Sequence, residues 1–72
     1  MSVVKYDGPA AVFSITHDGQ SNFQVTLCDP SNGEATAFPV NEIGPYTGRN
    51  PISAGPTIIE VIADGNWTFT KS

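Results

Sequence analysis

Two side chains of this 72-residue sequence could form a nucleophile–base pair: Cys28, the one cysteine, and His17, the one histidine. Such catalysis needs a thiol beside a base that a third group orients. The spacing does not exclude a pair, but alternation gives Cys28 the outward side of its segment, and His17 borders a turn. We interpret them as a small structural cysteine and a surface histidine. The sequence therefore predicts no catalytic residue and no enzyme.

The acidic residues offer a second chemistry, because paired carboxylates can act as acid and base on glycosidic bonds. Four of the seven, Asp7, Asp18, Asp29 and Asp64, lie in expected turns, where such side chains normally bond nearby backbone. Glu60 differs, since it lies between Ile58 and Ile62 on one side of an expected strand. That side is either an interface in which Glu60 is paired or ordinary surface, and both interpretations stay open.

Closely spaced oxygen atoms at Asp29, Ser31, Asn32 and Glu34 resemble part of a calcium loop, which repeats such ligands at alternate positions. The D-x-D-x-D-G pattern is missing, so a turn is the favoured interpretation. One cysteine and one histidine cannot make a structural zinc cluster. We predict no metal and no cofactor.

The segment 44–56 is the most unusual, with three prolines and three glycines, and we expect it to be an irregular loop. Its candidate ligand-binding residues are Tyr46, Gly48, Arg49 and Asn50. Tyr46 offers a stacking ring, Arg49 a planar fork of donors, and Gly48 a close backbone approach. The lysine and helix of a phosphate-binding loop are missing. The alternative is a structural crossover with Tyr46 packed inward and Arg49 paired with an acid.

The elements that must position these residues show the period-two alternation of half-buried strands. Strands are expected at 11–16, 23–28, 57–63 and 67–70, with weaker ones at 3–6 and 34–40. The segment 57–63 is apolar on both sides apart from Glu60, as in a central strand or in a strand whose second face meets another surface. Pro39 moves its strand towards a sheet edge. Asp18-Gly19 and Asp64-Gly65 predict tight turns, because glycine accepts positive φ.

No segment of helical length combines apolar spacing with a cap, so no helix longer than one turn is expected. Short strands with frequent turns predict an all-β fold, a small antiparallel β-sandwich or jelly-roll-like barrel, as one domain over residues 1–72. The predicted core is Phe13, Ile15, Phe23, Val25, Leu27, Ile59, Val61, Trp67 and Phe69.

Charge and size limit the classes of partner that the protein is expected to bind. The net charge is −4, and the three cations, Lys5, Arg49 and Lys71, cannot form a basic cluster. We therefore expect no binding to bulk nucleic acid or to an anionic membrane. No signal peptide or membrane span is visible, and a single cysteine fits a reducing cytoplasm, so a cytoplasmic location is favoured without being fixed. A domain this small with no disulfide favours self-association.

The sequence contains, in this order, four segments of interest: Val12-Phe13-Ser14-Ile15, Ser21-Asn22-Phe23-Gln24-Val25-Thr26-Leu27, Ile43-Gly44-Pro45-Tyr46-Thr47-Gly48 and Ile59-Glu60-Val61-Ile62-Ala63-Asp64-Gly65-Asn66-Trp67-Thr68. Their order resembles small jelly-roll-like β-sandwich accessory modules of bacterial and phage proteins over about residues 10–70. The resemblance implies a final hairpin at 60–68, a binding role and no catalytic residues. Unlike those modules, this sequence shows no export signal and no second domain.

The leading hypothesis is a non-enzymatic binding module that self-associates, with Val12, Ile58, Glu60 and Ile62 at the contact. One alternative is a protein that binds or sequesters a sugar or a nucleotide-type anion, such as a phage-encoded inhibitor of a host system. A third is a structural or decoration component of a phage or surface assembly.

Overall fold

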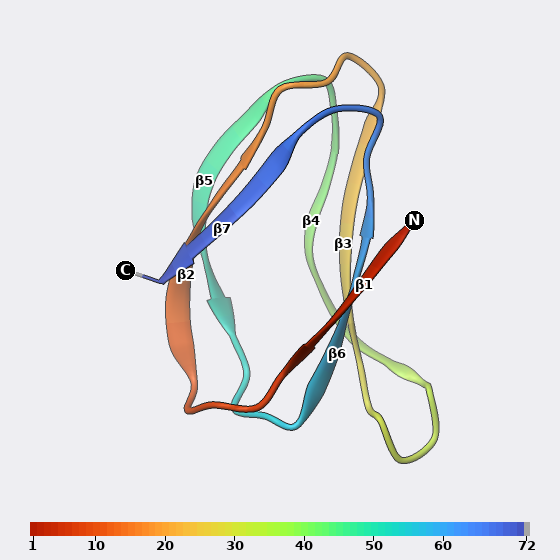
Figure 1. Ribbon diagram of the computed structural model, residues 1–72, viewed down its shortest axis with the longest axis vertical. Coiled ribbons are helices and arrows are strands. Elements are labelled where there is room, and N and C mark those ends of the chain that lie inside the picture. The colour runs from red at the N-terminus through yellow and green to blue at the C-terminus, as the bar shows by residue number, and fades with distance from the viewer. Residues whose placement is uncertain (72) are drawn as a thin grey trace.

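The computed structural model describes residues 1–71 as seven strands, with no helix among them (Figure 1). The strands are β1 (Ser2–Tyr6), β2 (Ala11–His17), β3 (Asn22–Cys28), β4 (Ala35–Ile43), β5 (Tyr46–Ile52), β6 (Thr57–Ile62) and β7 (Trp67–Lys71). A four-stranded sheet has the order β1-β6-β3-β4, and a three-stranded sheet has the order β5-β2-β7. All strand pairs are antiparallel. The predicted all-β sandwich is confirmed.

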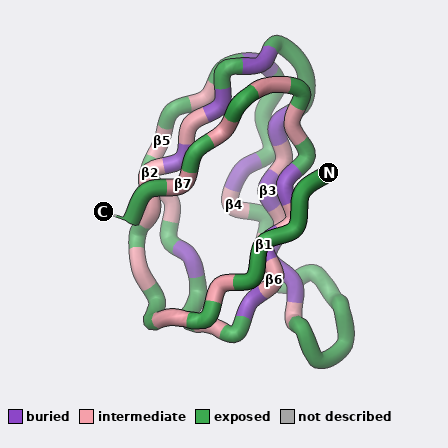
Figure 2. Tube along the Cα trace, viewed as in Figure 1, coloured by how far each residue is buried: buried purple, intermediate pink, exposed green. Residues whose placement is uncertain are grey.

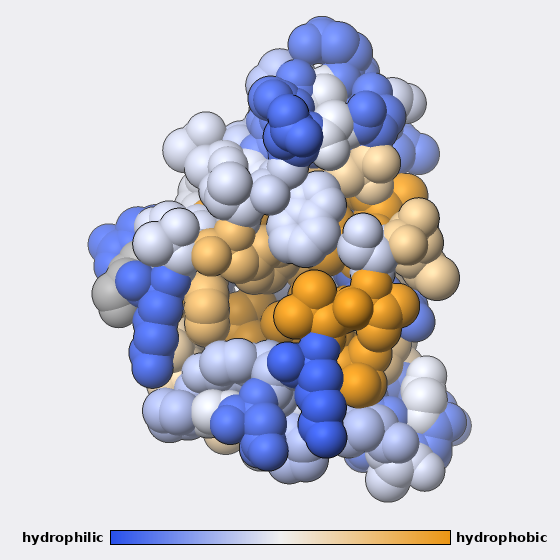
Figure 3. Space-filling view, viewed as in Figure 1, coloured by the Kyte–Doolittle hydropathy of each residue, from blue (hydrophilic) through white to orange (hydrophobic). Residues whose placement is uncertain are grey.

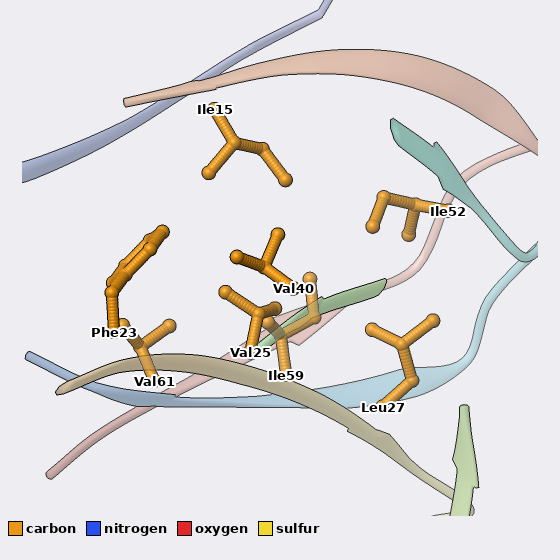
Figure 4. Packing of buried hydrophobic residues seen from close by; sticks show 8 residues of the cluster. All are labelled: Ile15, Phe23, Val25, Leu27, Val40, Ile52, Ile59 and Val61. Atoms are coloured by element: carbon orange, nitrogen blue, oxygen red, sulfur yellow. The ribbon is translucent and has the colours of Figure 1, made fainter. Parts of the chain in front are cut away.

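Alternate side chains of the two sheets meet in one core (Figure 4). The buried cluster consists of Ile15, Phe23, Val25, Leu27, Val40, Ile52, Ile59 and Val61. Six of these were expected from alternation; Val40 and Ile52 were not. The expected core residues Phe13, Trp67 and Phe69 are only partly buried and pack against the cluster. They lie where the interior opens to solvent, as described below.

The strand order confirms two expectations. β6 is central in its sheet, between β1 and β3, as its two apolar sides indicated. β4 is an edge strand, and its pairing with β3 shifts register between Val25 and Leu27, opposite Phe38 and Pro39. Proline has no N–H to donate, so it fits an edge or a bulge.

The expectation of an irregular segment at 44–56 is wrong for residues 46–52, which form β5. This strand pairs with β2 from Ala11↔Ile52 to His17↔Tyr46. Gly44, at φ 93°, turns the chain from β4 into β5. Because β5 is an edge strand bonded only to β2, Pro51 can lie in it without breaking a second ladder. The glycines and prolines of this segment interrupt the apolar–polar alternation by which a strand is recognised in the sequence.

The two Asp-Gly turns are also built differently from the expectation. β6 and β7 belong to different sheets, so Asp64-Gly65 crosses between sheets and closes no hairpin. Neither Gly19 nor Gly65 has positive φ; among residues 1–71 only Gly33 and Gly44 do. A Cβ on Gly19 would lie 2.1 Å from Asp64 Oδ1, and one on Gly65 would lie 2.5 Å from Asp18 Oδ1. Close approach of the opposite turn therefore requires these glycines.

Candidate binding surfaces

An apolar cleft opens on the side of the sandwich where β1 and β7 are the edge strands. Three ring contacts line it: Tyr6 on Phe13 at 5.4 Å edge-to-face, Phe13 near Phe69 at 6.4 Å, and Trp67 on Phe69 at 5.5 Å edge-to-face. The cavity has a volume of about 110 Å³ and is lined by Val4, Lys5, Tyr6, Phe13, Ile59, Val61, Trp67 and Phe69. Figure 3 looks onto the side where β1 and β7 lie in front, and shows apolar atoms gathered between polar ones.

The outer face of the four-stranded sheet carries exposed apolar side chains. Val3 is 59% exposed, Phe38 63%, Ile43 79% and Ile62 43%. Val3 is the register partner of Glu60, and Ile62 that of Gln24. β1 is exposed over most of its length (Figure 2). Apolar residues gathered on one face of a small domain are typical of a contact surface.

The outer face of the three-stranded sheet is different, because it is rich in hydroxyl groups. Register aligns Thr47, Thr16 and Thr68 in one row across the three strands, and Arg49, Ser14 and Thr70 in the next. The Thr16 and Thr68 hydroxyls are hydrogen-bonded to each other. Val12 and Pro51 follow in the third row.

At one end of the sandwich, the buried imidazole of His17 lies among three connections between strands: β2–β3, β4–β5 and β6–β7. Its side chain stacks on Phe23 with centroids 4.4 Å apart, and the residue is 3% exposed, so the expected surface histidine is wrong. Nδ1 lies 2.9 Å from Gly44 O, and because a carbonyl only accepts, Nδ1 carries the proton of this bond. Nε2 lies 3.2 Å from Asp64 Oδ1 but is not aligned for a hydrogen bond within residues 1–71.

Asp64 is held in the same cluster by backbone donors. Its Oδ2 accepts from Gln20 N at 3.1 Å and Ser21 N at 3.0 Å. Partial burial raises the pKa of Asp64, but the N–H groups of Gln20, Ser21 and Asp64 itself, with His17 nearby, outweigh burial and hold that pKa below its ordinary value. Asp18 Oδ1 correspondingly accepts from Asn66 N at 2.7 Å. The cluster fastens the β2–β3 loop to the β6–β7 connection.

The structure does not bring His17 and Cys28 together. His17 stacks on Phe23, near the start of β3, whereas Cys28 ends the same strand, so the length of β3 separates them. Cys28 is buried despite its outward parity. Burial first, then the charge and a hydrogen bond of Glu60, raise the pKa of the Cys28 thiol, which disfavours a reactive thiolate.

The segment 29–34 uses its oxygen atoms within its own turn, as expected. Asp29 Oδ1 accepts from both the backbone N and the hydroxyl of Ser31, at 2.8 and 2.7 Å. Asn32 Oδ1 accepts from Glu34 N at 2.9 Å. Among residues 1–71, no three histidine, cysteine or acidic side chains are grouped so that they could hold a metal ion.

The four predicted ligand-binding residues lie on opposite sides of β5. Tyr46, Gly48 and Asn50 share the inward side, where Asn50 Nδ2 donates to the Tyr46 hydroxyl at 2.8 Å and the Tyr46 ring covers Gly48. Arg49 lies on the outer face of the three-stranded sheet, between the exposed residues Thr47 and Pro51 of the same strand. The inward packing of Tyr46 agrees with the structural alternative; a binding role for these residues stays a prediction.

The predicted contact residues are also divided. Ile58, Glu60 and Ile62 lie on the outer face of the four-stranded sheet, and Val12 lies on the outer face of the three-stranded sheet. A single patch cannot include both. The sequence missed Phe38 and Ile43 as exposed apolar residues, since Phe38 sits at a register shift that alternation cannot reveal. It also missed the cleft, because which strands form open edges is a property of topology.

Within residues 1–71, no helix long and apolar enough to cross a membrane is present. No family model, curated protein or solved structure matches the chain.

Proposed function

We propose that this protein is a non-enzymatic interaction module that binds a second copy of itself through the outer face of its four-stranded sheet. The observation that carries the proposal is the exposure of Val3, Phe38, Ile43 and Ile62 on the strands of this sheet. Soluble monomers rarely expose gathered apolar surface without a use for it.

The pattern of this face suits a contact between proteins. Polar residues alternate with the apolar ones across the strands: Glu60 lies between Val3 and Thr26, and Gln24 lies between Ile62 and Asn41. Interfaces of soluble proteins are on average little more than half apolar, with hydrogen-bonding groups among the apolar contacts. The mixture therefore fits a contact surface better than it fits an exposed hydrophobic core.

The charges of the face are compatible with a second copy. Lys5 is the register partner of Ile58 and therefore lies on the same side of the sheet as Glu60. In a twofold contact each surface meets its own copy, so a face with one cation and one anion can pair both. A chain of this size buries only about 60% of its unfolded surface when folded, and association would stabilise it further.

Sedimentation velocity at micromolar concentration tests the proposal. The variant Ile62→Lys places a charge in the proposed contact, and Val12→Lys places the same charge on the outer face of the opposite sheet, where Val12 is 39% exposed. We expect the wild type and Val12→Lys to sediment as the same oligomer and Ile62→Lys to dissociate at least about tenfold more readily. Circular dichroism of both variants verifies that they are folded.

A wild type that is monomeric at every concentration contradicts the proposal. So does dissociation by Val12→Lys with Ile62→Lys unaffected, because that result would move the contact to the hydroxyl-rich face.

A further inference from the structure

The aromatic cleft has room for one small apolar group. Its volume of about 110 Å³ is somewhat less than the roughly 150 Å³ of an engineered apolar cavity that binds benzene. The rings of Tyr6, Phe13, Trp67 and Phe69 are all partly buried against the core, and all four residues line the cleft. Apolar atoms with a few polar groups at the entrance are the usual lining of a small-molecule site.

Two of the three cationic residues of the chain lie beside this opening. Lys5, on the edge strand β1, lines the cleft, although its register places its side chain on the outer side of the sheet. Lys71 shares the inward side of β7 with Phe69 and is the register partner of Phe13. Neither lysine forms an ion pair with any residue of the described part of the chain, 1–71. Lysine stems lie along apolar surface while the ammonium reaches water, so both can hold a positive charge at the mouth.

The rest of the charge distribution makes this placement notable. The chain has seven acidic residues and a net charge of −4, and its third cation, Arg49, lies on the outer face of the three-stranded sheet. Of the acidic residues, Asp7 follows Tyr6 at the end of β1, so one carboxylate is near in sequence. The apolar opening of an acidic protein is thus flanked by two lysines that form no ion pair within residues 1–71.

We infer that the cleft binds a small amphiphilic carboxylate, with one ring-sized apolar group among Tyr6, Phe13, Trp67 and Phe69 and its carboxylate at the mouth near Lys5 and Lys71. The apolar group supplies most of the affinity by burial, and the two ammonium groups select an anion over a neutral analogue. A ligand of this size has few atoms with which to gain binding energy, so we expect affinity in the millimolar range. Lys5 also lies on the side of the sheet proposed for self-association, so ligand binding is measured by fluorescence below the concentration at which the protein associates.

The probes are 4-phenylbutyrate and its neutral amide, which have the same ring and chain. Trp67 is the one tryptophan of the sequence and lines the cleft, so its fluorescence and its indole N–H resonance report occupancy. We expect both ligands to perturb Trp67, with the carboxylate binding about two- to fivefold more tightly for each lysine that contributes. This preference should shrink as salt is added.

Two variants separate the lysines from general charge effects. Lys5→Gln/Lys71→Gln removes both cations at the mouth, and Arg49→Gln removes a cation on the opposite face. We expect the double variant to bind the amide as the wild type does and to lose its preference for the carboxylate. Arg49→Gln should keep that preference.

Failure of both ligands to perturb Trp67 overturns the site. Equal affinity for the carboxylate and the amide in the wild type, or an equal loss of preference in Arg49→Gln, overturns the anionic specificity. These measurements use ligand binding and not sedimentation, so their failure is distinguishable from failure of the self-association proposal.

Discussion

Asp18 and Asp64 lie on different connections, and each points its carboxylate at the glycine that follows the other. Asp64 Oδ1 occupies the place of a Cβ on Gly19, and Asp18 Oδ1 that of a Cβ on Gly65. Each aspartate also accepts backbone N–H groups of the opposite connection. This reciprocal contact holds the β2–β3 loop against the β6–β7 connection, which lies more than forty residues later in the sequence.

Gly19→Ala should destabilise the fold by about 1–3 kcal/mol, because the new methyl group displaces Asp64 from its donors and crowds His17 Nε2. Urea denaturation measures the loss. The matched control is a double-mutant cycle with Asp64→Ala: once the carboxylate is gone, Gly19→Ala should cost clearly less. Strictly additive costs would show that the contact does not constrain Gly19.

Stability should fall in acid through Asp64 and Asp29. Backbone N–H donors hold the pKa of Asp64 below its ordinary value despite partial burial. For Asp29, hydrogen bonds from the side chain and backbone of Ser31 outweigh burial and lower its pKa. A carboxyl whose pKa is lower in the folded state contributes stability that is present above its unfolded value of about 3.9 and is lost as pH falls through the folded value.

We therefore expect the free energy of unfolding to be level above about pH 5 and to decline below pH 4. In urea titrations from pH 2.5 to 7, Asp64→Asn and Asp29→Asn should each flatten this decline, and the double variant should flatten it further. An acid decline that persists unchanged in the double variant would exclude these two carboxylates as its source.

The Cys28 thiol should react slowly with a disulfide reagent at pH 8 in the folded protein and quickly in urea, since it is buried and its pKa is raised. Glu60→Gln removes the neighbouring charge, so the thiolate fraction and the rate should rise. Glu42→Gln, on the exposed end of β4, serves as control. Equal reaction rates in the wild type and Glu60→Gln would show that Glu60 does not raise the pKa of the Cys28 thiol.

The strand that the sequence did not predict can be tested with one substitution at two sites. Ile52→Val removes a methylene from the core and should cost about 0.5–1.5 kcal/mol. Ile43→Val, at a residue 79% exposed, should cost less than about 0.5 kcal/mol. Equal costs would mean that Ile52, and with it β5, does not pack in the interior.

Much of the fold follows from alternation alone. Phe23, Val25 and Leu27 alternate with polar neighbours and all three are buried, because one side of their strand faces the opposite sheet. The central position of β6 was also predictable, because it has apolar residues on both sides. The edge position of β4 was predictable from Pro39. Local composition fixes these features directly.

Other features depend on relations that no single segment carries. Gly48 and Pro51 argue against a strand, yet β5 forms because it is an edge strand that pairs only with β2. The Asp64-Gly65 pair is typical of a hairpin turn, yet the strands on either side of it belong to different sheets. Gly65 is required because Asp18 leaves no room for a Cβ, and not because of a positive φ. The division of Val12 from Ile62 and the aromatic cleft follow from strand order, which the sequence of each strand does not specify.

The most direct test of the proposed self-association is the concentration dependence of backbone amide NMR spectra of the wild-type protein. On raising the concentration across the association range, we expect resonances of β1, β6 and β4, with Val3, Ile62 and Phe38 among them, to shift or broaden. Resonances of β2, β5 and β7 should stay unchanged. Spectra that do not depend on concentration, or changes confined to the three-stranded sheet, would contradict the account.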